Sequence, residues 1–185
     1  MADLTTLANV KEYLDIKTDD TTFDSLLERL ITASSMQIES YCNCDFTIQD
    51  YSESYDGTAS DILFLNHTPI VAVSSLSIDD EAVDTDDFKV YDDYIRLVSR
   101  LFTAGKLNVA IEYSAGYFDP QTESPPDDVE DACIQLAVFK FNVRGANGLL
   151  QSHVNQVTYS YADLAIPLSV AAILDKYRRP RVGAV

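Results

Sequence analysis

The chain has no tryptophan and only three cysteines, six glycines and six prolines among its 185 residues. Three cysteines are too few, and odd in number, for a secreted disulfide framework, and Cys42-Asn-Cys44 lacks the Cys-x-x-Cys spacing of redox and zinc sites. No apolar run approaches the roughly 20 residues that span a bilayer, and Met1-Ala-Asp-Leu4 lacks the basic and apolar regions of a signal peptide. We therefore expect a soluble protein made in a cytoplasm, with no membrane partner and no disulfide.

Basic residues are also scarce. Thirteen Lys and Arg stand against thirty Asp and Glu, which gives a formal net charge of −17. Such a surface repels nucleic acid, so the charge argues against a groove that grips phosphates. Four of the basic residues gather in the last ten positions, where the sequence has no acid: Lys176, Arg178, Arg179 and Arg181. This tail is either a solvated end that balances a helix dipole or an arm that docks on an acidic partner.

Helical periodicity dominates both ends of the sequence. Apolar residues at helical spacing predict helices over residues 5–15, 20–44, 126–144 and 167–178. Thr5 or Thr6 can cap the first helix, and Asp19 or Asp20 the second. At 1.5 Å rise per residue, the second helix is a rod of roughly 36 Å, which we take as the backbone of the domain.

Residues 47–117 show strand-like periodicity instead. Leu107, Val109, Ile111 and Tyr113 alternate with polar or small residues, as in a half-buried strand. Turn pairs such as Asp56-Gly57 and Asp79-Asp80 separate the short apolar runs. The sequence thus predicts an α+β fold that is mainly a helical bundle with a small antiparallel β insertion. The predicted domains are a helical core (1–46 and 118–145), the β insertion (47–117), and a connector arm with a C-terminal helix and basic tail (146–185).

Catalytic motifs are missing from the sequence. There is no Gly-x-Ser-x-Gly, no phosphate-binding Gly-x-x-x-x-Gly-Lys and no His-Glu-x-x-His. The acid-rich segment Ile78–Phe88 offers oxygen ligands for calcium, but it lacks the turn glycine and the terminal bidentate Glu of such loops, so we interpret it as a solvated hairpin tip. A carboxylate-based hydrolase would need two acids in one pocket, and nothing marks any pair. We predict no catalytic residue, no metal site and no cofactor.

Taken in order, several segments resemble the head–tail connector (adaptor, or head completion) family of long-tailed bacteriophages. The resemblance covers most of the chain and rests on the order and spacing of weak motifs, each of which marks packing or a turn. These motifs are Leu4–Ile16, the Asp19-Asp20 break, Leu26–Ile31, Leu63-Phe-Leu65 with Pro69-Ile70, Tyr113-Ser-Ala-Gly-Tyr117, the helix begun by Pro126, and Tyr177-Arg178-Arg179. One departure is Asp79-Asp80, where many relatives use Asp-Gly.

The resemblance implies a structural virion protein that forms a ring, commonly of twelve subunits, between the portal and the stopper or tail-completion proteins. DNA would pass through the channel without specific binding. The C-terminal segment would dock on the portal, which gives a role to Ile173, Leu174, Tyr177, Arg178, Arg179 and Arg181. The alternatives are another neck component, such as a stopper or tail terminator, and the hydrolase.

Overall fold

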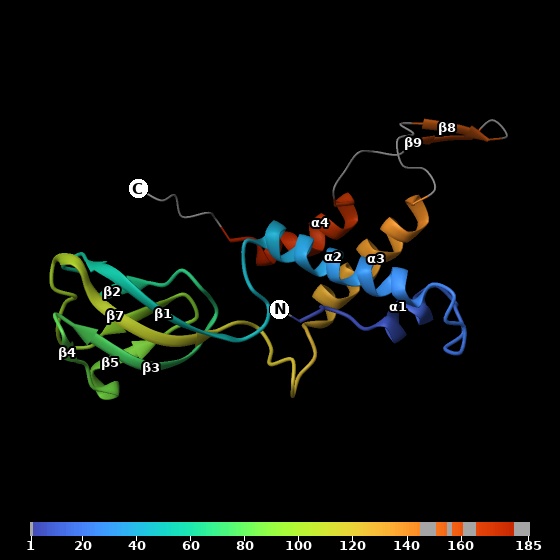
Figure 1. The fold of residues 1–185 in the computed structure, drawn as a ribbon. Helices are drawn as coiled ribbons and strands as arrows, with labels where there is room; N and C mark the ends of the chain where they lie inside the picture. Colours follow the sequence, from blue (N-terminus) through green and yellow to red (C-terminus); the bar gives the residue numbers. More distant parts are fainter. Residues whose placement is uncertain (1, 145–150, 155–156, 161–165, 180–185) are drawn as a thin grey trace. The chain divides into compact units, whose positions relative to one another are not determined.

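The computed structural model describes residues 2–144, 151–154, 157–160 and 166–179. These residues fall into two compact units. The helical unit comprises Met1–Asn43 and Pro125–Arg179, and the sheet unit comprises Cys44–Ser124. The helices and strands of both units are labelled in Figure 1.

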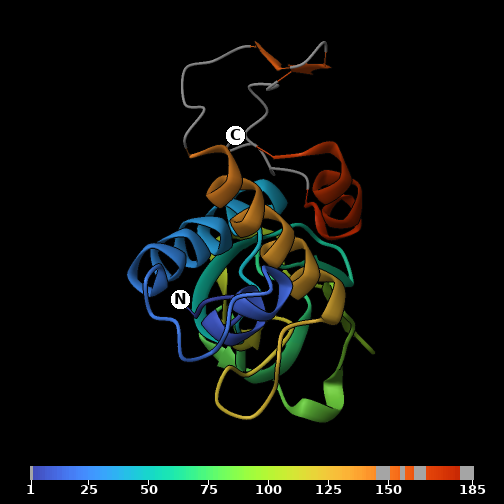
Figure 2. The same ribbon diagram turned by 90° about the vertical axis from the view of Figure 1, so that its right-hand side faces the viewer.

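The helical unit is built on α2 (Asp24–Cys42) and α3 (Asp127–Val143), which pack against each other. The shorter helices α1 (Leu7–Tyr13) and α4 (Leu168–Leu174) both contact this pair, and Figure 2 shows them on opposite sides of α3. Apolar side chains from α1, α2 and α3 form one core cluster, whose buried members are Val10, Leu27, Ile31, Ala137, Val138 and Phe141. Strands β8 (Gln151–Val154) and β9 (Val157–Ser160) pair as an antiparallel hairpin.

The helix boundaries follow from local hydrogen bonding. Thr6 caps α1, since its hydroxyl accepts a hydrogen bond from the backbone N–H of Asn9 at 3.3 Å, as predicted. The predicted Asp19 or Asp20 cap of α2 is wrong. Asp20 instead accepts the backbone N–H of Thr22 in a turn before the helix, and α2 begins four residues later than predicted, at Asp24. Asn43, with φ of 53°, ends α2 in the left-handed conformation that asparagine tolerates.

The sheet unit contains two antiparallel sheets. One has the strand order β1-β7-β3-β4 and the other the order β2-β6-β5. The first is formed by β1 (Gln49–Gly57), β7 (Gly105–Ala115), β3 (Ile70–Ile78) and β4 (Glu81–Ala82); the second by β2 (Ile62–Phe64), β6 (Tyr94–Leu97) and β5 (Phe88–Val90), which follows the 3₁₀ turn η1 (Thr85–Asp87). Both sheets contribute to one buried cluster that includes Leu63, Ile95, Phe88, Val109, Ile111 and Tyr113.

The prediction of a mainly helical bundle is therefore wrong. The described fold is α+β. It has four helices, and seven of its strands form two sheets in a separate unit. Alternation was visible in β7, where Val109, Ile111, Tyr113 and Ala115 are buried. The other strands of these sheets are short or irregular, and their pairing joins residues far apart in sequence. Hydrophobic periodicity along the sequence therefore underestimated how much of the fold is sheet.

The β3–β4 hairpin has a two-residue turn in which Asp79 and Asp80 both have positive φ, 53° and 66°. This is the conformation of a type I′ turn, in which glycine is preferred at the second position. We expect Asp80→Gly to stabilise the protein by about 0.5 kcal/mol, because relief of left-handed strain exceeds the added chain entropy. Asp84→Gly is the control: Asp84 has φ of −67°, so the same change should destabilise. Urea unfolding measures both, and a loss of stability in Asp80→Gly would contradict this reading of the turn.

Candidate interaction surface

The C-terminal segment, predicted to dock on a partner, is anchored in the helical unit. Pro167 precedes α4, and its carbonyl accepts the backbone N–H of Ala171 at 2.9 Å. Val170 and Leu174 are buried, at 1% and 0% exposure. The segment continues as the 3₁₀ turn η2 (Asp175–Tyr177) and leaves it extended at Arg178.

The structure brings five of the six predicted docking residues together on this segment. Arg178 is exposed, whereas Ile173, Tyr177 and Arg179 are half-buried. Leu174 is fully buried, so it holds α4 in place and offers no surface to a partner in this conformation. Arg181 lies outside the described residues.

One contact group ties the segment to the start of α3. The hydroxyl of Tyr177 donates to Asp128 Oδ1 at 2.7 Å, and Lys176 forms an ion pair with the other carboxylate oxygen. Partial burial alone would raise the pKa of Asp128, but the hydrogen bonds from Lys176 and Tyr177 outweigh it and lower the pKa below its ordinary value. Asp128 therefore stays charged and holds η2 against the helix N-terminus, where a negative charge is also favoured.

A second contact group ties the segment to the end of α2. The hydroxyl of Tyr41 donates to Asp175 Oδ1 at 2.7 Å, and this hydrogen bond raises the pKa of Tyr41. The guanidinium of Arg178 lies 5.3 Å from the Tyr41 ring centroid, a cation–π contact. The backbone N–H of Arg179 donates to the carbonyl of Cys42 at 2.8 Å. The basic end of the segment is thus held at a defined place on the helical unit.

Sequence reasoning missed Tyr41, Asp128 and Asp175, which position this segment. Tyr177 and Asp128 are 49 positions apart, and Tyr41 and Asp175 are 134 positions apart. No local pattern links residues at such separations, and tyrosines and acids are common in this chain.

The surroundings of the three cysteines indicate a structural role. Cys42 and Cys133 are fully buried and Cys44 is partly exposed, and none of the three takes part in a disulfide. Burial raises the pKa of the Cys133 thiol to about 11, and its sulfur lies 3.5 Å from the Ser35 hydroxyl. A thiol with so high a pKa is almost wholly protonated near neutral pH and is a poor nucleophile.

Within the described ranges, no group of three or more His, Cys, Asp or Glu side chains is arranged to hold a metal ion. Among the described helices, none combines the length and apolar character needed to cross a bilayer.

The fold of this chain matches solved structures. One is titled "Neck of empty GTA particle computed with C6 symmetry", with 19% identity, 96% of this chain and 91% of that chain covered, and a TM-score of 0.63. Another is titled "Neck of native GTA particle computed with C12 symmetry", with 18% identity, 97% and 91% coverage, and a TM-score of 0.57. A third, "Virion of native gene transfer agent (GTA) particle", gives 18% identity, 96% and 91% coverage, and a TM-score of 0.61. At these identities the matches show a shared fold.

A comparison with curated proteins finds no match. The family model described as "HCP: Head completion protein" matches residues 3–180, which includes nearly the whole chain and both units. This match confirms the family resemblance read from the sequence motifs. The chain belongs to the head completion protein family.

Proposed function

We propose that this protein forms a ring, of twelve subunits, between the portal and the stopper or tail-completion proteins of a long-tailed phage or a phage-like particle. The ring extends the DNA channel and joins head to tail. The family match over residues 3–180 carries this proposal. A fold shared with proteins from neck structures solved with sixfold and twelvefold symmetry supports it.

The charge of the chain suits a passage for DNA. With a net charge of −17 per subunit, a wall built from many copies repels a polyanion and lets it slide, whereas a phosphate-binding wall would retain it. Like charges on neighbouring subunits also oppose ring closure. Assembly therefore depends on local contacts between subunits and on the portal as a template.

The C-terminal segment is the proposed portal-docking element. Its accessible features are the exposed guanidinium of Arg178, the half-buried Ile173 and, at the start of α4, Leu168 with 74% exposure. An exposed leucine and a basic group on one short segment match the composition of an interface in which an apolar anchor is rimmed by charge. Contacts of Asp128 and Tyr41 with this segment keep it ordered before it binds, which lowers the entropic cost of docking.

We expect Arg178→Glu combined with Arg181→Glu to reduce portal binding by at least about 100-fold while leaving the fold intact, because two cations of the docking segment become acids. Arg179 is left unchanged, since its backbone is bonded to Cys42 and its side chain is half-buried. The measurement is co-sedimentation of the purified chain with portal particles. Arg29→Glu, a charge reversal on the exposed face of α2, is the control. Equal binding by the double variant and this control would refute the docking role.

A further inference from the structure

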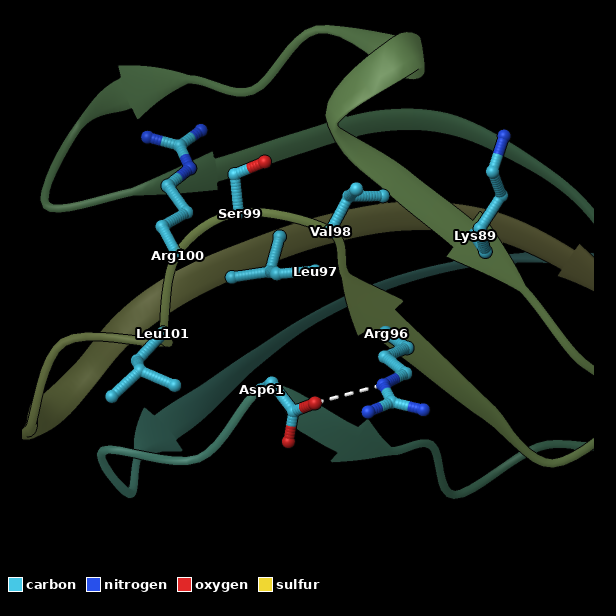
Figure 3. Close-up of a pocket in the computed structure, with 8 residues that line it drawn as sticks. All are labelled: Asp61, Lys89, Arg96, Leu97, Val98, Ser99, Arg100 and Leu101. Carbon is cyan, nitrogen blue, oxygen red and sulfur yellow. Dashed lines mark hydrogen bonds and ion pairs between the residues drawn. The ribbon is translucent and has the colours of Figure 1, made fainter.

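A basic groove lies on the sheet unit, far in sequence from the docking segment. It is an open depression of about 560 Å³ lined by β5, β6 and the loop after β6. Its lining includes three cations, one acid and two exposed apolar side chains: Lys89, Arg96, Arg100, Asp61, Val98 and Leu101. In Figure 3, Lys89 and Arg100 extend to the same side of this loop, while Arg96 extends toward Asp61.

Basic residues are concentrated in this groove, although the sheet unit as a whole is acidic. Residues 44–124 contain sixteen acidic and four basic residues, and three of those four, Lys89, Arg96 and Arg100, line the groove. Lys89 is paired directly opposite Arg96 on neighbouring antiparallel strands. Like charges in that position destabilise a sheet. Asp61 offsets part of this cost through an ion pair of 2.7 Å with Arg96, yet Arg96 keeps 54% of its side chain exposed.

Exposed apolar and aromatic side chains accompany the cations. Val98 and Leu101 are 58% and 55% exposed in the groove, and Phe64, on β2 of the same sheet, is 67% exposed. The Tyr94 ring stacks on Tyr91 at 4.5 Å and lies 5.5 Å from Phe64. The outward face of the β2-β6-β5 sheet therefore joins arginine and lysine to aromatic and aliphatic surface, a combination typical of protein interfaces.

We infer that this groove, together with the aromatic cluster of Phe64, Tyr91 and Tyr94, is the contact face for a second copy of this chain within the ring. The inference rests on the proposed ring function. Charge complementarity selects the occupant: a neighbouring sheet unit contains four times as many acids as bases, and three cations line the groove. Nucleic acid, the other polyanion near a neck, is disfavoured because the sheet unit as a whole, with sixteen acids against four bases, repels phosphates.

The charge also dictates the symmetry of the contact. A twofold contact centred on the groove would place it against its own copy, with cations facing cations. A head-to-tail contact, in which the groove of one copy meets an acidic face of the next, avoids that repulsion. Repetition of such a contact closes into a ring when the rotation between copies permits. The groove thus favours a cyclic assembly over a dimer.

Charge reversal in the groove tests the inference. Lys89→Glu combined with Arg100→Glu should weaken addition of successive copies at a portal by about tenfold or more and abolish cooperative binding. The control is Lys17→Glu with Lys106→Glu, which makes the same change of net charge at exposed positions outside the groove lining. The readout is the number of chains bound per portal particle as the purified chain is titrated, and circular dichroism checks folding. Cooperative, stoichiometric binding by the groove variant would overturn the inference.

A second measurement identifies the occupant without a destabilising change. A photo-cross-linking amino acid replaces Val98, and portal-bound assemblies are irradiated and the linked peptides identified by mass spectrometry. Links to acidic segments of another copy are expected; links only to portal or to added single-stranded DNA would overturn the inference. Failure of the wild-type chain to bind the portal at all would instead refute the proposed function, so the two failures are distinguishable.

Discussion

Replacement of Gly116 by alanine is expected to destabilise the sheet unit by at least about 3 kcal/mol, a large part of the stability of a domain. Gly116 follows β7 and has φ of 144°, a conformation that L side chains rarely adopt. A Cβ atom there would lie 2.6 Å from each of three backbone atoms: the Cα and N of Ile48 and the carbonyl oxygen of Thr47. Backbone cannot move aside as a flexible side chain can, so the strain and the overlap add.

The hydrogen bonds around Gly116 explain why the overlap cannot be relieved locally. Its N–H donates to the carbonyl of Pro69 at 3.0 Å. On one side, Tyr117 N–H donates to Phe46 O at 2.8 Å, and Ile48 N–H donates to Phe118 O at 2.9 Å. A shift of Gly116 would therefore break bonds to two other segments at once. Urea unfolding measures the loss, with Ser114→Ala, two residues earlier, as a control expected to change stability by about 0.5 kcal/mol or less. Similar stability of the two variants would contradict this account of the close approach between Gly116 and the backbone of Thr47 and Ile48.

This glycine also shows what a motif can and cannot reveal. Tyr113-Ser-Ala-Gly-Tyr117 contributed to the family resemblance as a pattern of letters. The reason for its glycine, the close approach of residues 47 and 48, depends on a segment almost 70 positions earlier and became visible only in the folded chain. The sequence could predict that Val109, Ile111 and Tyr113 share a buried face, because alternation is local. It could not predict that β7 lies between β1 and β3, because that order is set by long-range pairing.

The helices were better specified, since their apolar stripes are local. Leu27, Ile31 and Ile38, at helical spacing, are all buried on α2. The ends were less certain because competing hydrogen bonds decide them, as at Asp20. Prediction from the apolar period was also incomplete for the docking segment. The apolar period placed Leu174 correctly on the inward face of α4, but gave no sign that Leu168 is exposed.

Replacement of Glu53 by alanine is expected to cost about 2–3 kcal/mol, because Glu53 is the acceptor at the centre of a half-buried network. The hydroxyls of Tyr55 and Tyr113 donate to Glu53 Oε2 at 2.5 and 2.6 Å, and the Asn66 amide donates to Oε1 at 3.1 Å. The tyrosine hydroxyls in turn accept the backbone N–H groups of Asn66 and His67. The network thus ties the chain after β2 to β1 and β7.

A matched control exists on the neighbouring strand. Glu112 lies on β7, is exposed, and accepts a single hydrogen bond of 3.1 Å from Ser75. Glu112→Ala removes the same side chain from the same sheet without leaving buried donors unpaired, so it should change stability by about 0.5 kcal/mol or less. A loss in Glu53→Ala no larger than in this control would show that the network is not cooperative.

The charge of Glu53 makes its contribution depend on pH. Partial burial would raise the pKa of this carboxyl, but the hydrogen bonds from Tyr113, Tyr55 and Asn66 outweigh it and hold the pKa below its ordinary value of 4.5. A carboxyl with a lowered pKa in the folded state adds stability that is fully present above the unfolded-state pKa. That stability is lost as pH falls through the folded-state pKa, because the proton binds the unfolded chain first.

We therefore expect Glu53→Gln, which keeps the shape and removes the charge, to lie furthest below the wild type in stability above about pH 5.5. The gap between the two should narrow as pH falls below 4.5, the ordinary pKa. Urea unfolding of both proteins at a series of pH values gives this gap directly. Other carboxyls with lowered pKa values, such as Asp20 and Asp128, are present in both proteins and largely cancel in the difference. A gap that stays constant across the series would mean that the tyrosines bind the protonated carboxyl as well as the carboxylate, and that the charge of Glu53 adds nothing to the network.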